Sequence, residues 1–365
     1  MKTRMTLLLT ALLLFCGAQQ VNADSLRYIT ADTLTLVGKA MPGGSHWHRI
    51  DTAQYSALPP KVKNLFRTPA GLAVCFTTDS KTIAARWELK KKKYNNNFSP
   101  IAQKGLDLYR LNESGAWQWT GVARPSMSNL KENKAVVAQN MPGKATTYLL
   151  YLPLYTELVS LEIGIDSAAT IQAAPDPFRH KVVIYGSSIL HGVGCSRPGI
   201  AFASQMSRRT GINFINLGLS GRGKMEGSVA DMLAEIDADA FVLDCMPNPT
   251  GDEINERAEY MVRTIRKAHP KAPIIMIESY RWENNYTDSV ARTAGDDRAR
   301  AFVSQAERLI QAGIPYLYLI RDHNAIGNDH EGSADGIHPN DLGFARIIAA
   351  YEPELLRILR ENGIE

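Results

Sequence analysis

The hydrophobic pattern of the chain changes near residue 172. Before that point, short apolar or alternating runs are separated by turn signals, and no clear amphipathic helix stands out. The runs are Leu72–Thr77, Thr82–Leu89, Leu106–Leu111, Thr147–Leu154 and Leu158–Ile165. Short strands of this kind predict a β-sandwich.

Residues 172–180 contain two prolines and predict a linker. Beyond them, apolar strands alternate with helical patterns. The strands are Lys181–Tyr185, Phe214–Leu217, Ala240–Asp244, Ile274–Glu278 and Tyr316–Ile320, and the helices are Ala201–Arg209, Glu226–Ile236, Asp252–Ala268, Arg298–Ala312 and Leu342–Asn362. This alternation predicts an α/β domain with a five-stranded parallel sheet between helices. Ligands bind such sheets at the carboxyl ends of the strands.

The first 23 residues differ from the rest. Lys2 and Arg4 precede a short apolar run, Leu7–Cys16, and small residues follow at Val21–Ala23. The run is too short for a membrane span of about 20 residues, so the pattern predicts a signal peptide and an exported protein, periplasmic or extracellular. The alternative is a lipoprotein attached through Cys16, against which the bulky Phe15 argues.

These boundaries divide the 365-residue chain into three parts: a signal peptide over residues 1–23, a β-sandwich domain over 24–175 and an α/β domain over 176–365. We expect no integral membrane span after cleavage. Oligomeric state is left open by the sequence.

Composition changes this picture little. Hydrophobic residues make up 45% and charged residues 21%, as in an ordinary globular protein. Without residues 1–23, which carry two positive and no negative charges, the net charge falls from +4 to about +2. Such a charge does not indicate a nucleic-acid partner. The basic run Lys90–Lys93 is followed by Asn95–Asn97, which favours a solvated hairpin tip over a binding patch.

Three cysteines remain after cleavage: Cys75, Cys195 and Cys245. An odd number excludes a fully paired framework. Cys195 and Cys245 could be bridged, or all three could be buried thiols. His46 and His48 are a weak metal signal, and we predict no metal site.

Polar side chains and glycines follow the first three predicted strands of the sheet. Ser188 lies in Gly186-Ser187-Ser188-Ile189, at a tight strand-to-helix turn that would expose its hydroxyl. Gly221 lies in a glycine-rich loop whose amides could bind phosphate or an oxyanion. Asn248 lies between two prolines, which restrict its backbone and would suit an amide aimed at an oxyanion. Taken alone, each is compatible with an ordinary turn, cap or loop.

Asp335 and His338 lie three residues apart before the last helix. A histidine acting as general base needs its proton on Nδ1, and a carboxylate at that nitrogen enforces this tautomer. Alone, this segment is also compatible with a surface turn and helix cap. All four blocks nevertheless fall at one edge of the predicted sheet, and their order makes coincidence improbable.

In this order of blocks the chain resembles the SGNH hydrolases, over roughly residues 181–360. The resemblance implies a flavodoxin-like domain in which Ser188 is the nucleophile, His338 the general base and Asp335 its orienting carboxylate. The backbone amides of Ser188 and Gly221 and the side chain of Asn248 would form the oxyanion hole. The first block departs from Gly-Asp-Ser-Leu at Ser187 and Ile189, so close kinship with GDSL lipases does not follow.

A second resemblance covers the N-terminal region. Gly105-Leu106-Asp107-Leu108-Tyr109 resembles the GxDLY motif of a β domain that precedes GDSL-like hydrolases, typically from Bacteroidetes. The segments Ser196–Gly199 and Gly223–Glu226 are also similar to that group. From the residues alone, the motif is an alternating β-strand.

We expect a serine esterase that needs no cofactor and acts on a small-molecule or glycan ester. Tyr280, Arg281 and Trp282 follow the fourth strand, where the two aromatic rings could stack on a sugar and Arg281 could bind a carbonyl or carboxylate. Alternatively, the aromatics only anchor the loop. The segment favours removal of acetyl groups from carbohydrates. A lipid or platelet-activating-factor-like acetylhydrolase and a non-catalytic glycan-binding protein remain alternatives.

Overall fold

The structure is a computed structural model that describes residues 25–365. The predicted signal peptide, residues 1–23, and the alternative lipid attachment at Cys16 lie outside the described residues. Across residues 25–365, no helix combines the length and apolar character needed to cross a bilayer.

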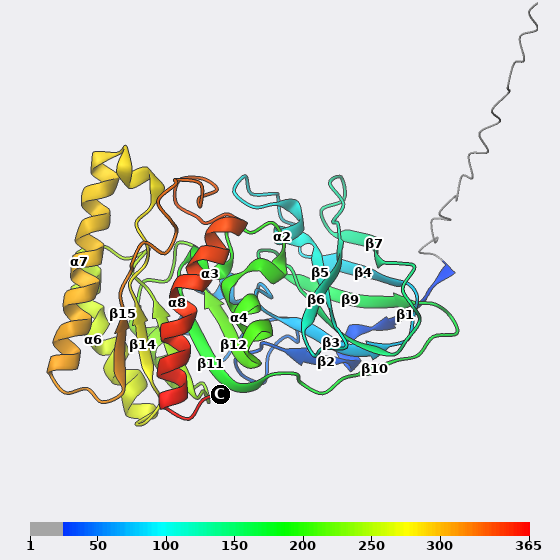
Figure 1. Ribbon diagram of the computed structural model, residues 1–365, viewed down its shortest axis with the longest axis horizontal. Helices are drawn as coiled ribbons and strands as arrows, with labels where there is room; N and C mark the ends of the chain where they lie inside the picture. The colour runs from blue at the N-terminus through cyan, green and yellow to red at the C-terminus, as the bar shows by residue number, and fades with distance from the viewer. Residues whose placement is uncertain (1–24) are drawn as a thin grey trace, which may run out of the picture.

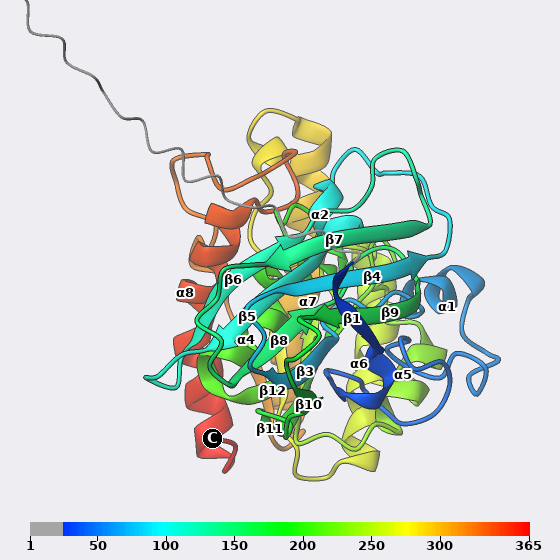
Figure 2. The same cartoon turned by 90° about the vertical axis from the view of Figure 1, so that its right-hand side faces the viewer.

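The N-terminal part of the chain forms two antiparallel sheets (Figure 2). The first has the strand order β1-β9-β4-β7, and the second has the order β10-β3-β8-β5-β6 with β2 paired to β3. The strands are β1 Arg27–Thr30, β2 Thr35–Val37, β3 Ala73–Thr78, β4 Ile83–Leu89, β5 Leu106–Leu111, β6 Trp117–Ala123, β7 Glu132–Ala138, β8 Thr146–Tyr151, β9 Leu158–Ile165 and β10 Ile171–Ala173. Side chains from both sheets, including Phe76, Trp87 and Leu150, share one buried apolar cluster. The predicted β-sandwich is confirmed.

The basic segment after β4 is not a hairpin tip. β4 pairs with β7 and β9, whereas the chain continues through helix α2 (Pro100–Lys104) to β5 in the other sheet. Lys92 lies against the protein, with Nζ 2.8 Å from the carbonyl oxygen of Tyr155 and 3.6 Å from the centre of its ring. The interpretation of this run as a solvated tip is therefore wrong for Lys92.

A short helix that the sequence pattern did not predict packs against the α/β part. Helix α1 (Pro60–Phe66) buries only Val62 and Phe66, too few positions to display a helical period. Both side chains belong to the apolar cluster on one face of the parallel sheet, together with Ile50. The predicted boundary between residues 175 and 176 stays a prediction, and apolar contacts cross it.

The GxDLY-like segment also contacts the α/β part. Asp107 on β5 is fully buried, and its carboxylate accepts hydrogen bonds of 2.8 Å from Arg197 Nη1 and from the Gly199 amide. Trp119 Nε1 donates to the other oxygen at 3.0 Å, and the Tyr109 hydroxyl also contacts Arg197. The motif thus holds the segment around Arg197 against the sandwich.

The C-terminal part is built on a five-stranded parallel sheet in the order β12-β11-β13-β14-β15 (Figure 1). The strands are β11 Arg179–Gly186, β12 Ile212–Gly218, β13 Ala240–Asp244, β14 Ile274–Ile277 and β15 Leu317–Ile320. All five were predicted. Because the first strand has the second on one side and the third on the other, the switch in strand order lies at β11, where such sheets bind ligands.

Helices cover both faces of this sheet (Figure 1). They are α3 Ser188–His191, α4 Phe202–Thr210, α5 Gly227–Ala234, α6 Gly251–Ala268, α7 Ser289–Gln311 and α8 Asp341–Glu361, with 3₁₀ turns at Pro198–Ile200 and Glu283–Tyr286. A further 3₁₀ turn, Ala31–Thr33, lies in the sandwich. Helix α7 begins nine residues before its predicted start. The Asp288 side chain caps it by accepting from the amides of Val290 and Ala291, and the exposed first turns carry little apolar signal.

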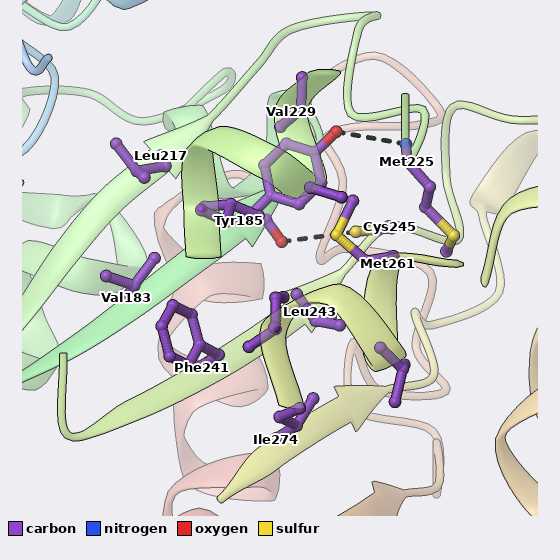
Figure 3. Close-up of a cluster of buried hydrophobic side chains, with 14 of the residues drawn as sticks. Val183, Tyr185, Leu217, Met225, Val229, Phe241, Leu243, Cys245, Met261 and Ile274 are labelled. Atoms are coloured by element: carbon purple, nitrogen blue, oxygen red, sulfur yellow. Dashed lines mark hydrogen bonds between the residues drawn. The ribbon is translucent and has the colours of Figure 1, made fainter. Parts of the chain in front are cut away.

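Two apolar clusters lie on opposite faces of the sheet, because successive strand residues point to opposite sides. Val183 and Tyr185 pack with α5, α6 and α7, whereas Val182 and Ile184 pack with α3, α4 and α8. Figure 3 shows part of the first cluster, in which Cys245 points to the carbonyl oxygen of Tyr185.

All three cysteines of the described chain are buried and unpaired. Cys195 belongs to one cluster and Cys245 to the other. The sheet separates these two thiols, so the possible bridge between them is absent from this structure.

Candidate active site

Ser188 is the first residue of helix α3, and a single residue, Ser187, separates it from the end of β11. The preceding Ser187 caps the helix, since its Oγ accepts from the Ile189 amide at 3.2 Å. The turn requires a glycine at 186, where a Cβ would lie only 2.2 Å from the carbonyl oxygen of Asp244 on the neighbouring strand. Ser188 is 7% exposed, so its hydroxyl sits in the floor of the site.

Three side chains form a hydrogen-bonded chain at this edge of the sheet. Ser188 Oγ lies 2.8 Å from His338 Nε2, and His338 Nδ1 lies 2.8 Å from Asp335 Oδ2. With Nδ1 protonated and donating to the carboxylate, Nε2 presents a lone pair to the serine hydroxyl. The structure therefore brings together the three residues predicted as a triad, in an arrangement competent for nucleophilic catalysis.

The Asp335 carboxylate is oriented by the turn that carries it. Its Oδ1 accepts from the amides of His338 at 2.9 Å and Ile337 at 3.1 Å. Burial raises the pKa of Asp335, but its hydrogen bonds with His338 and Ile337 outweigh burial and leave the pKa below its usual value. Asp335 is thus ionised at neutral pH and can stabilise an imidazolium on His338.

Tyr280 is hydrogen-bonded to the turn that carries Asp335 and His338. Its hydroxyl donates to the carbonyl oxygen of Ile337 at 2.8 Å, and its side chain is 2% exposed. A ring buried in this way has no face for a sugar, which corrects the expected stacking role of Tyr280. It instead fixes the residue next to His338.

Trp282 and Arg281 do not form the expected open platform either. The Trp282 ring is half-buried, and the Arg298 guanidinium lies 4.6 Å from its centre. Arg281 is exposed, 3.9 Å from Asp296 and 5.1 Å from the ring of Tyr286. Of the three, only Arg281 remains available to a ligand without rearrangement.

The loop after β12 crosses the end of β11. The Leu219 amide donates to the Gly186 carbonyl at 2.9 Å, and the Gly223 amide donates to Asn248 Oδ1 at 3.0 Å. Gly221 has a φ of +67°, which favours glycine. Because Oδ1 of Asn248 is occupied by the loop, its Nδ2 is left to donate. The predicted oxyanion donors thus come from the ends of three adjacent strands.

Sequence reasoning missed three buried residues beside this site. Asp244 ends β13, and Ser187 Oγ donates to it at 3.2 Å; burial raises the pKa of Asp244 to about 8. His191 ends α3, and Arg49 reaches the end of β12 from the N-terminal part. Asp244 and His191 lie in the same sequence blocks as Asn248 and Ser188, so their positions in the sequence could have identified them. Nothing in the sequence near Arg49 could have done so, because its partners on β12 lie far along the chain.

Two cavities adjoin the site. One of about 710 Å³ lies beside Asp335, between the two parts of the chain. It is lined by Asn96–Ser99, Gly194–Ser196, Ala334, Asp335 and Asn340–Leu342. The other, of about 20 Å³, is an apolar space beneath the serine turn that also borders Asp244.

The two histidines that gave a weak metal signal in the sequence, His46 and His48, have other partners in the structure. His48 Nε2 lies 3.3 Å from Glu157 Oε1, while the His46 ring packs edge-on against Trp47. Among residues 25–365, no group of three or more His, Cys, Asp or Glu side chains is placed to hold a metal ion.

Comparison with known proteins finds matches for both parts of the chain. Residues 179–356 match the GDSL-like lipase/acylhydrolase family, and residues 26–171 match the GxDLY family of N-terminal regions of SGNH-hydrolase-type esterases. Both predicted resemblances are confirmed. No curated protein matches the chain.

Solved structures match nearly the whole chain. A Bacteroides ovatus protein described as a GDSL-like lipase is 47% identical with a TM-score of 0.90, covering 92% of this chain and 98% of that one. A salicylyl-acyltransferase from a tetracycline biosynthetic pathway is 17% identical (TM-score 0.72), and a family two carbohydrate esterase from Cellvibrio japonicus is 12% identical (TM-score 0.58). Both cover 92% of this chain and 98% of their own. At these low identities they show the shared fold.

Proposed function

The chain belongs to the GDSL-like lipase/acylhydrolase family, and from this premise we propose that it is an exported serine esterase that removes short acyl groups, acetyl above all, from carbohydrates. The observation that carries the proposal is the hydrogen-bonded chain from Ser188 through His338 to Asp335, at the carboxyl edge of the sheet. Export rests on the sequence pattern of residues 1–23.

In the proposed reaction, Ser188 Oγ attacks the ester carbonyl carbon while His338 Nε2 takes the hydroxyl proton. The tetrahedral intermediate collapses, and His338 returns the proton to the departing alcohol. A water molecule, deprotonated by His338, then attacks the acyl-enzyme and releases the acid and free Ser188. Asp335 stays ionised throughout and holds the imidazole in the reactive tautomer.

The oxyanion of each intermediate would be held by the amides of Ser188 and Gly221 and by Asn248 Nδ2. Such donors act strongly because they are fixed before the reaction and shielded from water. The hydrogen bond from Gly223 to Asn248 supports this role, since it leaves the amide nitrogen of Asn248 as the free end.

A hydroxyl-rich leaving group suits the cavity beside Asp335. Its lining includes polar side chains from both parts of the chain, with Asn96, Asn97 and Ser99 from the N-terminal part and Asn340 and Asp341 from the C-terminal part, beside apolar ones such as Phe98 and Leu342. A similar fold occurs in a Clostridium thermocellum family two carbohydrate esterase, whose structure holds cellohexaose (12% identity, TM-score 0.56, covering 80% of this chain and 93% of that one). These observations support a glycan over a lipid.

The first test is hydrolysis of p-nitrophenyl acetate and butyrate by the purified mature protein, with Ser188→Ala and His338→Ala. We expect acetate to be preferred and both variants to lose at least about 10³-fold in kcat. Ser114→Ala, at an exposed turn, is the matched control and should keep full activity. An inactive wild type, or an active Ser188→Ala, would overturn the mechanism.

The next test identifies the alcohol part of the natural ester. It compares the hydrolysis of acetylated xylo- and cello-oligosaccharides with that of a short-chain phospholipid ester. Faster turnover of the oligosaccharides supports the proposal, and faster turnover of the lipid supports the acetylhydrolase alternative. Oligosaccharide binding without turnover would support the non-catalytic alternative.

A further inference from the structure

One buried guanidinium links the N-terminal part of the chain to the loop after β12. Arg49 is 0% exposed, and all five of its N–H groups have acceptors. The acceptors are the carbonyl oxygens of Leu65, Thr68, Asn216 and Gly218 and the hydroxyl of Thr68. None of these acceptors is a carboxylate. Burial lowers the pKa of Arg49 to about 9, which still leaves it cationic at neutral pH.

Two of these acceptors fix the end of β12. Arg49 Nη1 donates to the carbonyl oxygens of Asn216 at 3.0 Å and Gly218 at 2.8 Å. Because the donors of one guanidinium lie in a rigid plane, both carbonyls are held in one orientation. The loop that carries Gly221 starts directly after them.

His191 holds the next residue of that loop. Its Nε2 lies 2.7 Å from the carbonyl oxygen of Leu154 and 3.2 Å from Thr68 Oγ1, and its Nδ1 lies 3.4 Å from the Ser220 amide nitrogen. A proton on Nε2 is needed to donate to the carbonyl, so in the neutral ring Nδ1 accepts from the Ser220 N–H. Burial lowers the pKa of His191 well below its usual value, and the charge of Arg49 lowers it further.

We propose that Arg49 and His191 are positioning residues that fix the direction of the Gly221 N–H, so that the N-terminal part of the chain contributes to turnover itself. The peptide that carries this N–H joins Ser220 to Gly221. Arg49 and His191 restrain the chain that leads into it, through the end of β12 and the Ser220 amide, in addition to the hydrogen bonds of Leu219 with Gly186 and of Gly223 with Asn248. This inference rests on the proposed function, because it takes Gly221 as an oxyanion donor.

The decisive variants are His191→Leu, which removes all polar contacts of the ring with Leu154, Thr68 and Ser220, and His191→Gln, whose amide can still donate to Leu154. With p-nitrophenyl acetate, we expect kcat to fall about 10- to 100-fold in His191→Leu and less in His191→Gln. KM should stay within about threefold in both, because the ground-state ester does not depend on the oxyanion donors.

A second readout reports the oxyanion loop directly. A short alkylboronic acid adds to Ser188 Oγ as a tetrahedral anion, with the serine proton moving to His338, and so places an oxygen where the reaction intermediate has one. Its inhibition constant should rise in each variant by about the factor by which kcat/KM falls. Arg49→Met should show the same proportional change.

Val62→Ala is the matched control, since Val62 is a fully buried residue of the same N-terminal segment with an apolar side chain. It should lower the melting temperature and leave kcat unchanged below that temperature. If the His191 variants behave like Val62→Ala, with lower stability but wild-type kcat and boronate affinity, the inference is wrong. If Arg49→Met does not fold, the two His191 variants decide.

The test of these positioning roles and the test of the proposed function can fail independently. An active Ser188→Ala would overturn the function, whereas an inactive Ser188→Ala together with fully active His191 variants would overturn only the positioning roles of Arg49 and His191.

Discussion

Asp244 and Ser187 form a hydrogen bond beneath the serine turn, with 3.2 Å between Ser187 Oγ and Asp244 Oδ2. The Ser187 oxygen also accepts from the Ile189 amide, so its proton points to Asp244. The Gly-Asp-Ser-Leu motif has its aspartate at position 187, whereas here the carboxyl comes from the neighbouring strand β13. Asp244 is enclosed by apolar side chains and by Tyr280 and Tyr351.

Asp244 predicts a pH dependence of stability. Burial raises its pKa from 3.8 to about 8 in the folded protein, so between pH 4 and 8 the folded state holds a proton that the unfolded state lacks. The contribution of this proton to the free energy of unfolding is complete below pH 4. It is lost as the pH rises toward 8, by at most about 1.4 kcal/mol per pH unit. Urea unfolding between pH 5 and 9 should show Asp244→Asn becoming progressively more stable relative to the wild type. Parallel curves for the two proteins would contradict the prediction.

Asp335→Asn should lower kcat by roughly 10²- to 10⁴-fold while the protein stays folded. An amide at this position does not enforce the Nδ1–H tautomer of His338 or stabilise its cation. Stopped-flow assays of p-nitrophenyl acetate measure the loss. Asp329→Asn, an exposed aspartate of the same loop that is paired with Arg346, should keep kcat near wild type. Equal losses in both variants would point to loop disorder instead.

Asn248 allows its two ends to be tested separately. Asn248→Ala removes both the acceptor for Gly223 and the proposed donor, and should lower kcat about 10²- to 10³-fold. Asn248→Asp keeps an acceptor for the Gly223 amide and loses only the donor, while adding charge. We expect kcat to fall in both variants, with the loop better ordered in Asn248→Asp by amide hydrogen exchange. A wild-type kcat in either variant would remove Asn248 from the oxyanion hole.

Asp107→Ala tests the contact between the two parts of the chain. The change leaves the amide of Gly199, the indole of Trp119 and the Arg197 guanidinium without their shared acceptor, and should cost about 3 kcal/mol of unfolding free energy. Arg110→Gln is the control on the same strand, because the Arg110 guanidinium donates to the side chain of Gln118 at the protein surface. Urea titration should separate the two variants clearly, and a loss below about 1 kcal/mol for Asp107→Ala would refute the structural role.

Much of the fold was predictable because its signals are local. The five strands of the parallel sheet are apolar runs, and Asp335 and His338 lie close enough in sequence for their hydrogen bond to be expected. Helix α1 escaped notice because two buried residues do not make a period. Arg49 escaped because its partners Asn216 and Gly218 lie 167 and 169 residues away.

Tyr280 illustrates a different limit. An aromatic residue after a strand has the same sequence signal whether its ring is open to a sugar or buried under a turn. Only the packing of the His338 turn over Tyr280 decides between these, and that packing joins residues 57 positions apart.

The separation of Ser188 from His338 has a consequence for protein synthesis. The two residues are 150 positions apart, and ribosomes add about 5–20 residues per second. A nascent chain therefore carries its serine for roughly 8–30 s before the histidine and aspartate exist, and it gains both together because they share one turn. A polypeptide that stops just before that turn has the sandwich and all five strands of the parallel sheet, yet under the proposed mechanism it cannot hydrolyse esters.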